Sequence, residues 1–483
     1  MKKLNVTLIV VFFVLSVPFI FSQNETDAFR YSQLSPTGTA RFSSMANSMS
    51  GFGADFSALS FNPASIGVYK RSEFTFSPAL YHSKANSLYN KTEAYDFKYN
   101  FNVGNLGAVF VFPIDKQWII QFATGFNRMN NFHNRYIIKG PNIGHNGGST
   151  SMTDVFAHIS NGIADSNLTG IAYWAYQAYL IDPDTNSMYA HQYVSHLDGF
   201  DLNQRKVMQT TGSANEYVFS SGANFNDQIY IGATLGIPFF SYMENYTYSE
   251  KLADTDTNTT DFKSFTYKES ISSTATGVNF KLGILYQPFH FMRFGISYHT
   301  PSFYNNVSEY FSEDTEAEGR AVTHSLNGKF NYTLTTPSKV MGDLAFIINK
   351  YGFINLHYNY TDYSTMQLHA RDYDFDVENE NIRTSYKETH FLGIGSEINL
   401  SPVSIRLGYG YQTNPYRSTI NRDGSYHLIT GGLGMRTQYF FIDFAYVHKL
   451  YSTKSVLYHT ANSSIVDIDQ QNQHFILTFG LKI

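Results

Sequence analysis

Apolar and polar residues alternate with a period of two through most of the chain. The C-terminal segment 475–483 places Phe, Leu, Phe, Leu and Ile on one face, with Thr, Gly and Lys on the other. The same alternation recurs in 403–411, 278–286 and 229–237. A period of two predicts β-strands with one apolar face. Because the other face is rich in Gly, Asn, Lys and Arg, the strands are typical of a barrel with lipid outside and a polar lumen inside.

The spacing of these segments predicts fourteen strands joined by connections of two kinds. The predicted strands are 73–87, 95–113, 117–139, 203–225, 228–251, 261–287, 291–311, 322–349, 352–370, 383–399, 403–416, 424–436, 439–455 and 471–483. Alternate connections have two or three residues, whereas the others run from seven residues at 88–94 to about sixty at 140–202. Outer-membrane barrels place short turns on the periplasmic side and long loops outside. We therefore predict an all-β fold, a 14-stranded antiparallel transmembrane β-barrel over residues 73–483 in the cell outer membrane, with the C-terminus on the periplasmic side.

The composition also supports a membrane barrel. Aromatic residues make up 17% of the chain and charged residues only 15%, which is low for a soluble surface. The net charge of −5 gives no support to nucleic-acid binding. The chain has no cysteine, which excludes disulfides and thiolate metal sites.

The first residues have the features of an export signal. Lys2 and Lys3 precede the apolar run 8–21, and the small residue Ser22 follows it. This pattern predicts a secretory signal peptide over residues 1–22, because the run is too short for a membrane-spanning helix.

Residues 23–72 differ from the strands that follow. They are rich in Gly, Ala, Ser and Met and show no sustained alternation. Small residues permit close packing, so we predict an N-terminal hatch that folds inside the barrel. A periplasmic tail is the alternative, although four phenylalanines, Phe42, Phe52, Phe56 and Phe61, would then be exposed to water at a cost in free energy.

The long outer loop 140–202 contains a helical pattern. Ile171, Trp174 and Ala178 follow helical spacing. Loops of this length normally carry structure or function. We expect a helix over the barrel mouth in which these three side chains face a ligand; the alternative is that Trp174 forms the core of the loop itself.

Short motifs resemble the FadL family of outer-membrane transporters, which includes long-chain fatty acid transporters and TodX-type aromatic hydrocarbon channels. Asn62, Pro63 and Ala64 stand just before the first strand, as at the end of the hatch in that family. The stretches 292–302 (MRFGISYHTPS) and 334–346 (LTTPSKVMGDLAF) are also similar to it. The opening 30–42 (RYSQLSPTGTARF) resembles a branch labelled as haemin receptors.

The resemblance implies fourteen strands, a hatch in the lumen, capture of a hydrophobic ligand at outer loops and an inward kink in the third strand. It implies that this kink opens a lateral path into the membrane. The residues favour a break in the third strand at Gly125, Asn127, Asn130 and Asn131, where polar side chains interrupt the alternation. The alternative is that these residues have already left the membrane. The longest loop here follows strand three, whereas in the fatty acid transporters it follows strand five.

No catalytic constellation stands out, so we expect no enzyme, no cofactor and no metal site. His133, His145, His158, His191 and His196 lie in or beside the long loop without the spacing of helical metal ligands. Three functions remain: uptake of hydrophobic small molecules, either fatty acid-like or aromatic, with lateral release into membrane lipid; a haemin receptor; and an accessory barrel bound to other subunits of an outer-membrane complex.

Overall fold

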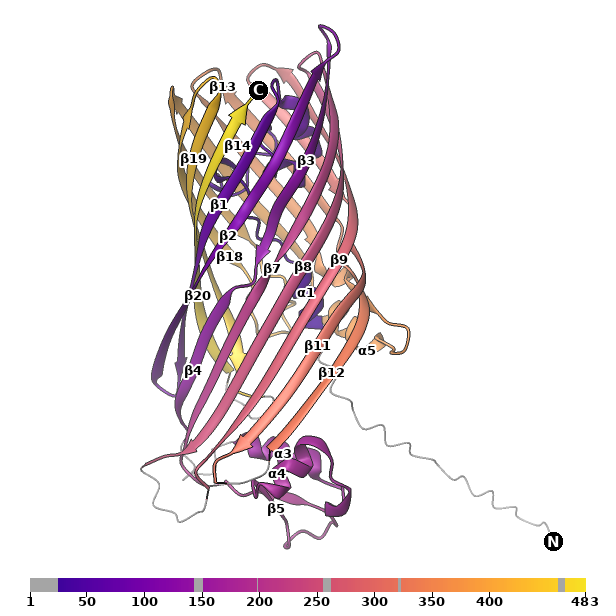
Figure 1. The fold of residues 1–483 in the computed structure, drawn as a ribbon, viewed down its shortest axis with the longest axis vertical. Helices are drawn as coiled ribbons and strands as arrows, with labels where there is room; N and C mark the ends of the chain where they lie inside the picture. Colours follow the sequence, from indigo (N-terminus) through magenta and orange to yellow (C-terminus); the bar gives the residue numbers. More distant parts are fainter. Residues whose placement is uncertain (1–24, 143–150, 198, 255–261, 320–322, 459–464) are drawn as a thin grey trace, which may run out of the picture.

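Eighteen β-strand segments form one closed antiparallel sheet in the computed structural model (Figure 1). The structure describes residues 25–142, 151–197, 199–254, 262–319, 323–458 and 465–483. The sheet closes into a barrel because β1 (Glu73–Tyr89) pairs with both β2 (Thr92–Pro113) and β20 (Ile465–Lys482). The predicted signal peptide, residues 1–22, lies outside the described residues.

Four of the barrel strands are broken, so the eighteen segments make fourteen strands, as the alternation predicted. The broken strands are β3 (Trp118–Asn131) with β4 (Asn134–Asn142), β10 (Met292–His299) with β11 (Phe303–Ala317), β12 (Thr323–Thr335) with β13 (Lys339–Ile348), and β14 (Gly352–Asp362) with β15 (Gln367–His369). The unbroken ones are β1, β2, β7 (Leu202–Phe225), β8 (Ile229–Leu252), β9 (Ser264–Phe289), β16 (Glu388–Leu400), β17 (Val403–Gln412), β18 (Tyr426–Arg436), β19 (Phe440–Val456) and β20.

The short turns lie at the same end of the barrel as the C-terminus, and the long loops lie at the other end (Figure 1). This confirms the predicted sorting of connections. Several strand boundaries differ from the prediction by a few residues, and at two of them the local structure also differs. The β1–β2 connection has only two residues, because Asn90 and Lys91 adopt positive φ and form a tight turn. Residues 383–385 belong to α5 (Asp376–Ser385) rather than to a strand.

Two neighbouring strands break at the same short sequence, Thr-Pro-Ser. The breaks fall at Pro301 and Pro337, because proline has no N–H to donate to a sheet. The backbone N–H of Thr336 donates to the carbonyl of Ser302, and the N–H of Ser302 donates to the Thr336 hydroxyl at 2.9 Å. These bonds satisfy the backbone groups that the strand pairing leaves free.

The outer face of the barrel is apolar across its middle and aromatic near the short turns. Leu407 is 63% exposed, whereas its neighbour Arg406 points inward and is buried. Exposed aromatic side chains beside the short turns include Trp118, Phe289, Phe291, Tyr351 and Tyr439. An apolar band with an aromatic girdle is the surface expected of a transmembrane barrel. Among the described residues, no helix is long and apolar enough to cross a membrane.

The remaining helices lie inside the barrel or over its outer end. The N-terminal segment (residues 25–72) contains α1 (Glu25–Ser32), α2 (Ala40–Ser43), η1 (Ser57–Ser60) and η2 (Pro63–Val68), and most of its side chains are buried. The loop after β4 holds α3 (Met152–Ser160), η3 (Asp165–Asn167), α4 (Gly170–Gln177), β5 (Ile181–Pro183) and β6 (Tyr193–Ser195) at the end opposite the C-terminus (Figure 1). A single turn, η4 (Tyr363–Thr365), separates β14 from β15.

The orientation of the strands predicts how a charge on the outer face affects stability. Leu407→Arg places a charge in the apolar band and should cost roughly 2–4 kcal/mol of folding free energy. Thr274→Arg, which also points outward but lies beyond the band, should cost about 0–1 kcal/mol. Urea titration of both variants in lipid vesicles measures the difference; equal costs would contradict the assigned depth.

Candidate functional site

The N-terminal segment packs against the inner wall at the Asn62-Pro63-Ala64 motif. The Asn62 side chain accepts a hydrogen bond from the Ala64 N–H at 3.1 Å and so begins η2, with Pro63 as its first residue. The wall has glycine where this turn touches it, because a Cβ on Gly232 would lie 2.3 Å from the Pro63 carbonyl oxygen. The motif therefore shapes the contact between the segment and strands β8 to β10.

The stretch 292–302 contacts the carbonyl of Phe61, the residue just before that motif. The Ser297 hydroxyl donates to the Phe61 carbonyl at 2.8 Å, and His299 Nε2 lies 2.7 Å from the same oxygen. Asn62 Nδ2 reaches the Ile296 carbonyl at 3.5 Å. Two of the stretches that carried the family resemblance therefore contact each other in the structure.

A cluster of charged side chains holds the segment to the wall around Arg41. Glu397 on β16 accepts hydrogen bonds from Arg41 Nε and Nη2, both at 2.9 Å, and from Arg406 Nε at 2.6 Å. Arg406 also donates to Asp443 at 2.7 Å, and so does Arg436. Arg41, Glu397, Arg406 and Asp443 are buried, so each charge depends on its partners.

The backbone ladder of the barrel is interrupted between the second and third strands. β2 pairs with β3 only from Pro113 to Asn105, whose partner is Asn127. Beyond that point β4 pairs with β7, and the pairings of the described residues give β4 no ladder to β2. We call this discontinuity, between residues 92–104 of β2 and residues 134–142 of β4, the seam.

The seam exists because the outer half of the third strand turns into the lumen. Asn134 accepts a hydrogen bond from Ser83 at 2.8 Å and donates one to Gln470 at 2.7 Å. The Ser87 hydroxyl donates to the Ile137 carbonyl at 2.6 Å. Ser83, Ser87 and Gln470 face inward on β1 and β20, so β4 lies against the inner side of the first strand.

Side chains rather than backbone bonds bridge the seam. Asn100 accepts a hydrogen bond from Asn131 Nδ2 at 3.2 Å and lies 3.1 Å from His133 Nε2. Arg135 and Asp96 form an ion pair at 3.1 Å, and Arg128 Nε donates to the Val103 carbonyl at 3.2 Å. Side-chain bridges between partly exposed groups are individually weak, so the seam is held less strongly than the regular ladders beside it.

The four residues expected at a kink all lie beside the seam or the N-terminal segment. A Cβ on Gly125 would lie 2.6 Å from the Phe56 ring. Asn127 Nδ2 donates to Ser60 at 2.9 Å, and Asn130 Nδ2 donates to the Gln33 carbonyl at 3.2 Å. The pairing with β7 slips between Arg128 and Asn130, which marks a bulge, and the pairing with β2 ends at Asn127.

The N-terminal segment occupies backbone groups that the seam leaves free. The Ser35 N–H donates to the Met129 carbonyl at 2.8 Å, and the Thr37 N–H donates to the Arg128 carbonyl at 3.2 Å. A Cβ on Gly104 would lie 2.2 Å from the Thr37 carbonyl oxygen. Residues 33–38 therefore line the inner side of the seam.

An aromatic row follows the seam on the outer face of β2. Its members are Tyr95, Phe97, Tyr99 and Phe101, all between 47% and 74% exposed. We call these four residues the aromatic row. On the same rungs, β1 carries Asn86, Lys84, His82 and Leu80, and β20 carries Asp469, Gln471, Gln473 and Phe475. On the rungs of Tyr95, Phe97 and Tyr99 the outer surface is polar on β1 and β20, whereas β2, at the edge of the seam, stays apolar.

A buried positive charge lies near the broken strands inside the barrel. Lys339 is buried and, in the described part of the chain, has no carboxylate partner. Its neighbour Lys281 is paired with Glu216 at 2.5 Å. Lys339, Lys281 and His299 line a small cavity with Tyr31 and Met129, and its volume of ≈ 30 Å³ is about that of one water.

The three loop residues expected to face a ligand lie mostly inside the loop. Trp174 and Ala178 are 1% and 2% exposed, and Ile171 packs at the edge of the same cluster. The Trp174 ring meets Phe156 edge-on at 5.8 Å and lies 6.4 Å from Phe265 on β9. In this structure Trp174 joins the loop to the barrel rather than lining a pocket.

Sequence reasoning missed the charge cluster, Lys339 and the aromatic row. The first two could have been found as charged residues on the polar faces of predicted strands, where a lumen places them. The aromatic row could have been recognised from the alternate aromatic residues at 95–101. No group of three or more potential metal ligands occurs among the residues that the structure describes.

The whole fold is similar to that of solved transport barrels. A Pseudomonas aeruginosa FadL homologue has a TM-score of 0.57 and 13% identity, over 93% of this chain and 99% of that one. The P. putida toluene transporter TodX gives 0.55 and 12%, and the Ralstonia pickettii toluene transporter TbuX gives 0.52 and 14%, both with the same coverage. Neither a protein-family model nor a curated protein matches the chain.

The fold is therefore that of an outer-membrane barrel with fourteen strands. The resemblance seen in the motifs is confirmed at the level of this fold, which the FadL homologue and the two toluene transporters share.

The charge cluster predicts what holds the N-terminal segment in place. Glu397→Gln leaves the buried Arg41 and Arg406 without their shared carboxylate, which should cost roughly 3–5 kcal/mol. We expect trypsin to cleave at Arg41 much faster while the folded barrel persists on a non-heated gel. Glu388→Gln, at the exposed end of the same strand, is the control; matching cleavage rates in the two variants would contradict the assignment.

Proposed function

We propose that the chain is an outer-membrane channel that takes up hydrophobic small molecules and releases them sideways through the seam. The observation that carries the proposal is the interrupted ladder between β2 and β4. A hydrophobic solute gains little from a water-filled pore, because its favourable transfer is into an apolar environment. A wall that side chains alone hold closed offers a path from the lumen to lipid.

The N-terminal segment acts as the hatch of this channel. Its side chains fill the lumen, and residues 33–38 bond to β3 at the inner side of the seam. A displacement of these residues would remove the Ser35 and Thr37 bonds to β3 together. Opening of the hatch and opening of the seam are thus one event in this proposal.

The aromatic row provides the surface along which a ligand moves. It extends outward from the apolar band on β2, one of the two strands that border the seam. The rings lie in contact along the strand, with centroids 5.9 Å apart from Tyr95 to Phe97 and 5.7 Å apart from Phe97 to Tyr99. A hydrophobic molecule on these rings remains in apolar contact between water and membrane.

Lys339 favours a ligand with an acidic group. Its ammonium lines a mixed polar and apolar cavity that also contains Lys281 and Glu216, and no carboxylate of the described chain forms an ion pair with it, so a carboxylate ligand would supply one. The cavity of ≈ 30 Å³ is too small for such a ligand, so α1, which contributes Tyr31 to its lining, would have to move to make room. Of the two substrate types, fatty acid-like and aromatic, this site supports the first.

Cysteine cross-linking tests the seam directly, because the chain has no thiol of its own. Asn100→Cys with Asn131→Cys replaces two side chains that bond to each other across the seam. A short bifunctional thiol-reactive reagent, a bis-methanethiosulfonate that forms a disulfide with each cysteine and releases methanesulfinate, should abolish uptake of radiolabelled oleate into cells, and the unreacted double variant should retain it.

Ile405→Cys with Leu433→Cys is the matched control, since these residues are direct partners in the regular β17–β18 ladder. Cross-linking there should leave uptake unchanged. Full uptake after confirmed cross-linking of the seam would refute lateral release.

Substitution of the aromatic row should weaken uptake without affecting the fold. Each aromatic contact with a ligand contributes about 1–3 kcal/mol. Phe97→Ser with Tyr99→Ser should therefore raise the half-saturating oleate concentration at least about tenfold. Tyr298→Ser, an equally exposed outward residue on β10, should leave it unchanged. The same increase in both would show that the row has no special role.

The outer loop supports a second candidate function, that of an accessory subunit in an outer-membrane complex. It presents Met188 and Tyr189, which are 95% and 75% exposed, together with Tyr179. Large apolar side chains with this exposure, close in the chain, mark a surface for a protein partner.

A pull-down separates this candidate from the channel. Met188→Ser with Tyr189→Ser should release a co-purifying outer-membrane protein while oleate uptake persists, if the chain is an accessory subunit. The Ser166→Ala variant, on an exposed polar part of the same loop, is the control. If the double variant releases no protein, the accessory function loses its support.

A further inference from the structure

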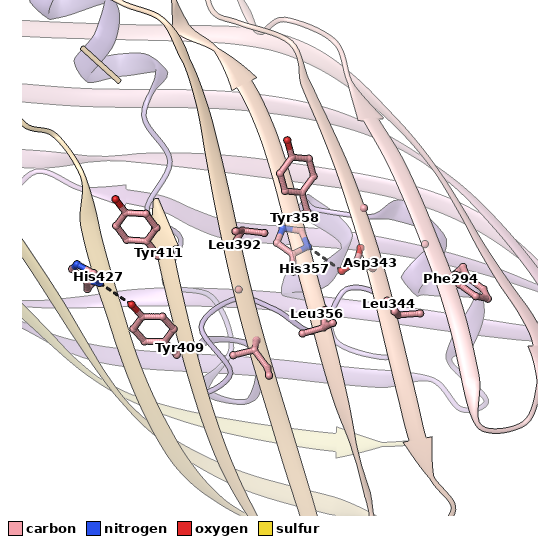
Figure 2. A pocket seen from close by; sticks show the side chains of 14 residues that line it. Phe294, Asp343, Leu344, Leu356, His357, Tyr358, Leu392, Tyr409, Tyr411 and His427 are labelled. Carbon is pink, nitrogen blue, oxygen red and sulfur yellow. Dashed lines mark hydrogen bonds and ion pairs between the residues drawn. The ribbon is translucent and has the colours of Figure 1, made fainter. Parts of the chain in front are cut away.

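A groove of ≈ 940 Å³ crosses the outer face of six consecutive barrel strands, β10, β13, β14, β16, β17 and β18 (Figure 2). Its lining follows two neighbouring rungs of the sheet. One rung contains Leu344, Leu356 and Ile394, and the next contains Tyr358, Leu392 and Tyr411. The groove is apolar along its length and has the volume of a small-molecule site.

The groove faces the membrane, not the lumen. Leu356, Leu392 and Ile394 are exposed on the outside, whereas Asp343 and His357, on the same strands, point inward as a buried pair 2.9 Å apart. The seam lies between the second and third strands of the barrel, and the groove covers the seventh to the twelfth. The two features are therefore on opposite sides of the barrel, so the groove is separate from the proposed exit.

A glycine deepens the groove. Gly342 occupies an outward position on β13, between Tyr358 on one neighbour and Ile296 on the other. A Cβ at Gly342 would meet no atom within 4 Å, so the space above it is open. A larger side chain would fill the groove without disturbing the wall.

The groove rises from the periplasmic end toward the outer end. Phe294, at one extreme, is two residues from the start of β10 at a short turn, and His427, at the other, is one residue from the loop end of β18. Neighbouring strands are ~4.8 Å apart, so five steps span roughly 24 Å. This length is comparable with the ~30 Å hydrocarbon core of a bilayer. It suits a long acyl chain.

Among the outward-facing lining residues that the structure describes, the hydrogen-bonding side chains are Tyr358, Tyr409, Tyr411 and His427, toward the outer end of the groove. The Tyr409 hydroxyl is 2.8 Å from His427 Nδ1, and the Tyr358 hydroxyl is 2.8 Å from His390 Nδ1. When the hydroxyl donates to Nδ1, the proton of the neutral imidazole resides on Nε2, which is then a donor. Within the described chain, neither Nε2 has a hydrogen-bond partner. His427 lines the groove and places one donor at the level of lipid headgroups, where it suits a phosphate, whereas His390 lies two strands away on β16 and is not part of the lining.

We propose that this groove binds a phosphorylated lipid of the surrounding membrane. One acyl chain lies along the two apolar rungs above Gly342, and the phosphate accepts a hydrogen bond from His427. The lipid is a structural ligand of the barrel, independent of the molecules that the channel transports.

Lipid retention by the purified protein tests the acyl-chain part. The protein is prepared in dodecyl maltoside, mixed with phosphatidylglycerol and measured by native mass spectrometry. The wild-type chain should retain one phosphatidylglycerol, and Gly342→Leu at least about tenfold less. Gly431→Leu is the control, because Gly431 also points outward but lies outside the groove, and a Cβ there meets only ordinary contacts at 3.7 Å. Equal retention by all three proteins, or none by the wild type, would overturn the proposal.

Comparison with diacylglycerol tests the headgroup part without any variant. The wild-type chain should retain phosphatidylglycerol at least about tenfold more than diacylglycerol of the same acyl composition. His427→Leu should remove this preference while leaving diacylglycerol retention unchanged. Equal retention of the two lipids by the wild type would overturn the phosphate assignment. Oleate uptake by Gly342→Leu should stay normal, so a failure here is distinguishable from a failure of the channel function.

Discussion

Backbone hydrogen bonding inside a membrane is the constraint on which this structure depends. Lipid offers no partner for a free N–H or C=O, so a membrane-spanning sheet must close on itself. The ladder is interrupted at the seam, where β2 and β4 have no pairing in common among the described residues. There, β4 turns inward, and residues 35 and 37 of the N-terminal segment bond to the carbonyls of β3. The N-terminal segment thus supplies hydrogen-bond partners to backbone groups of the wall at the seam.

The same dependence explains the residues of the inner wall. Glycines stand where the N-terminal backbone touches the strands, as at Gly232 against Pro63. Charged side chains fix the position of the segment on the wall, as in the Arg41–Glu397–Arg406 group. Close contact and buried charge pairs act over a short range and demand a defined geometry, so they hold the segment in one place. Side-chain bridges at the seam are individually weaker than a continuous backbone ladder.

The period of two was sufficient to predict the barrel, because each lipid-facing position must be apolar regardless of its neighbours. Leu407 and Phe475 show this directly. The tight turn at Asn90 and the helix at 376–385 were not predicted, since short polar segments carry no such periodic constraint. Gly125, Asn127, Asn130 and Asn131 were noticed as an interruption, but their contacts with residues 33–60 depend on how two distant segments pack. Trp174 shows the same limit: helical spacing identified its helix, whereas Phe156 and Phe265, which surround it, come from other elements.

The bonds of Ser35 and Thr37 to β3 also bear on the order in which the chain assembles. Carbonyls of Arg128 and Met129 can accept from the N-terminal segment or from a neighbouring strand, and in this structure the segment has them. Strands that pair progressively from the short turns would meet the segment at Asn105 and Asn127 and stop there. A barrel that closed before the segment arrived would have no such stop, and its second and third strands could continue to pair. The seam is the arrangement expected when the N-terminal segment is in place before the second and third strands finish pairing.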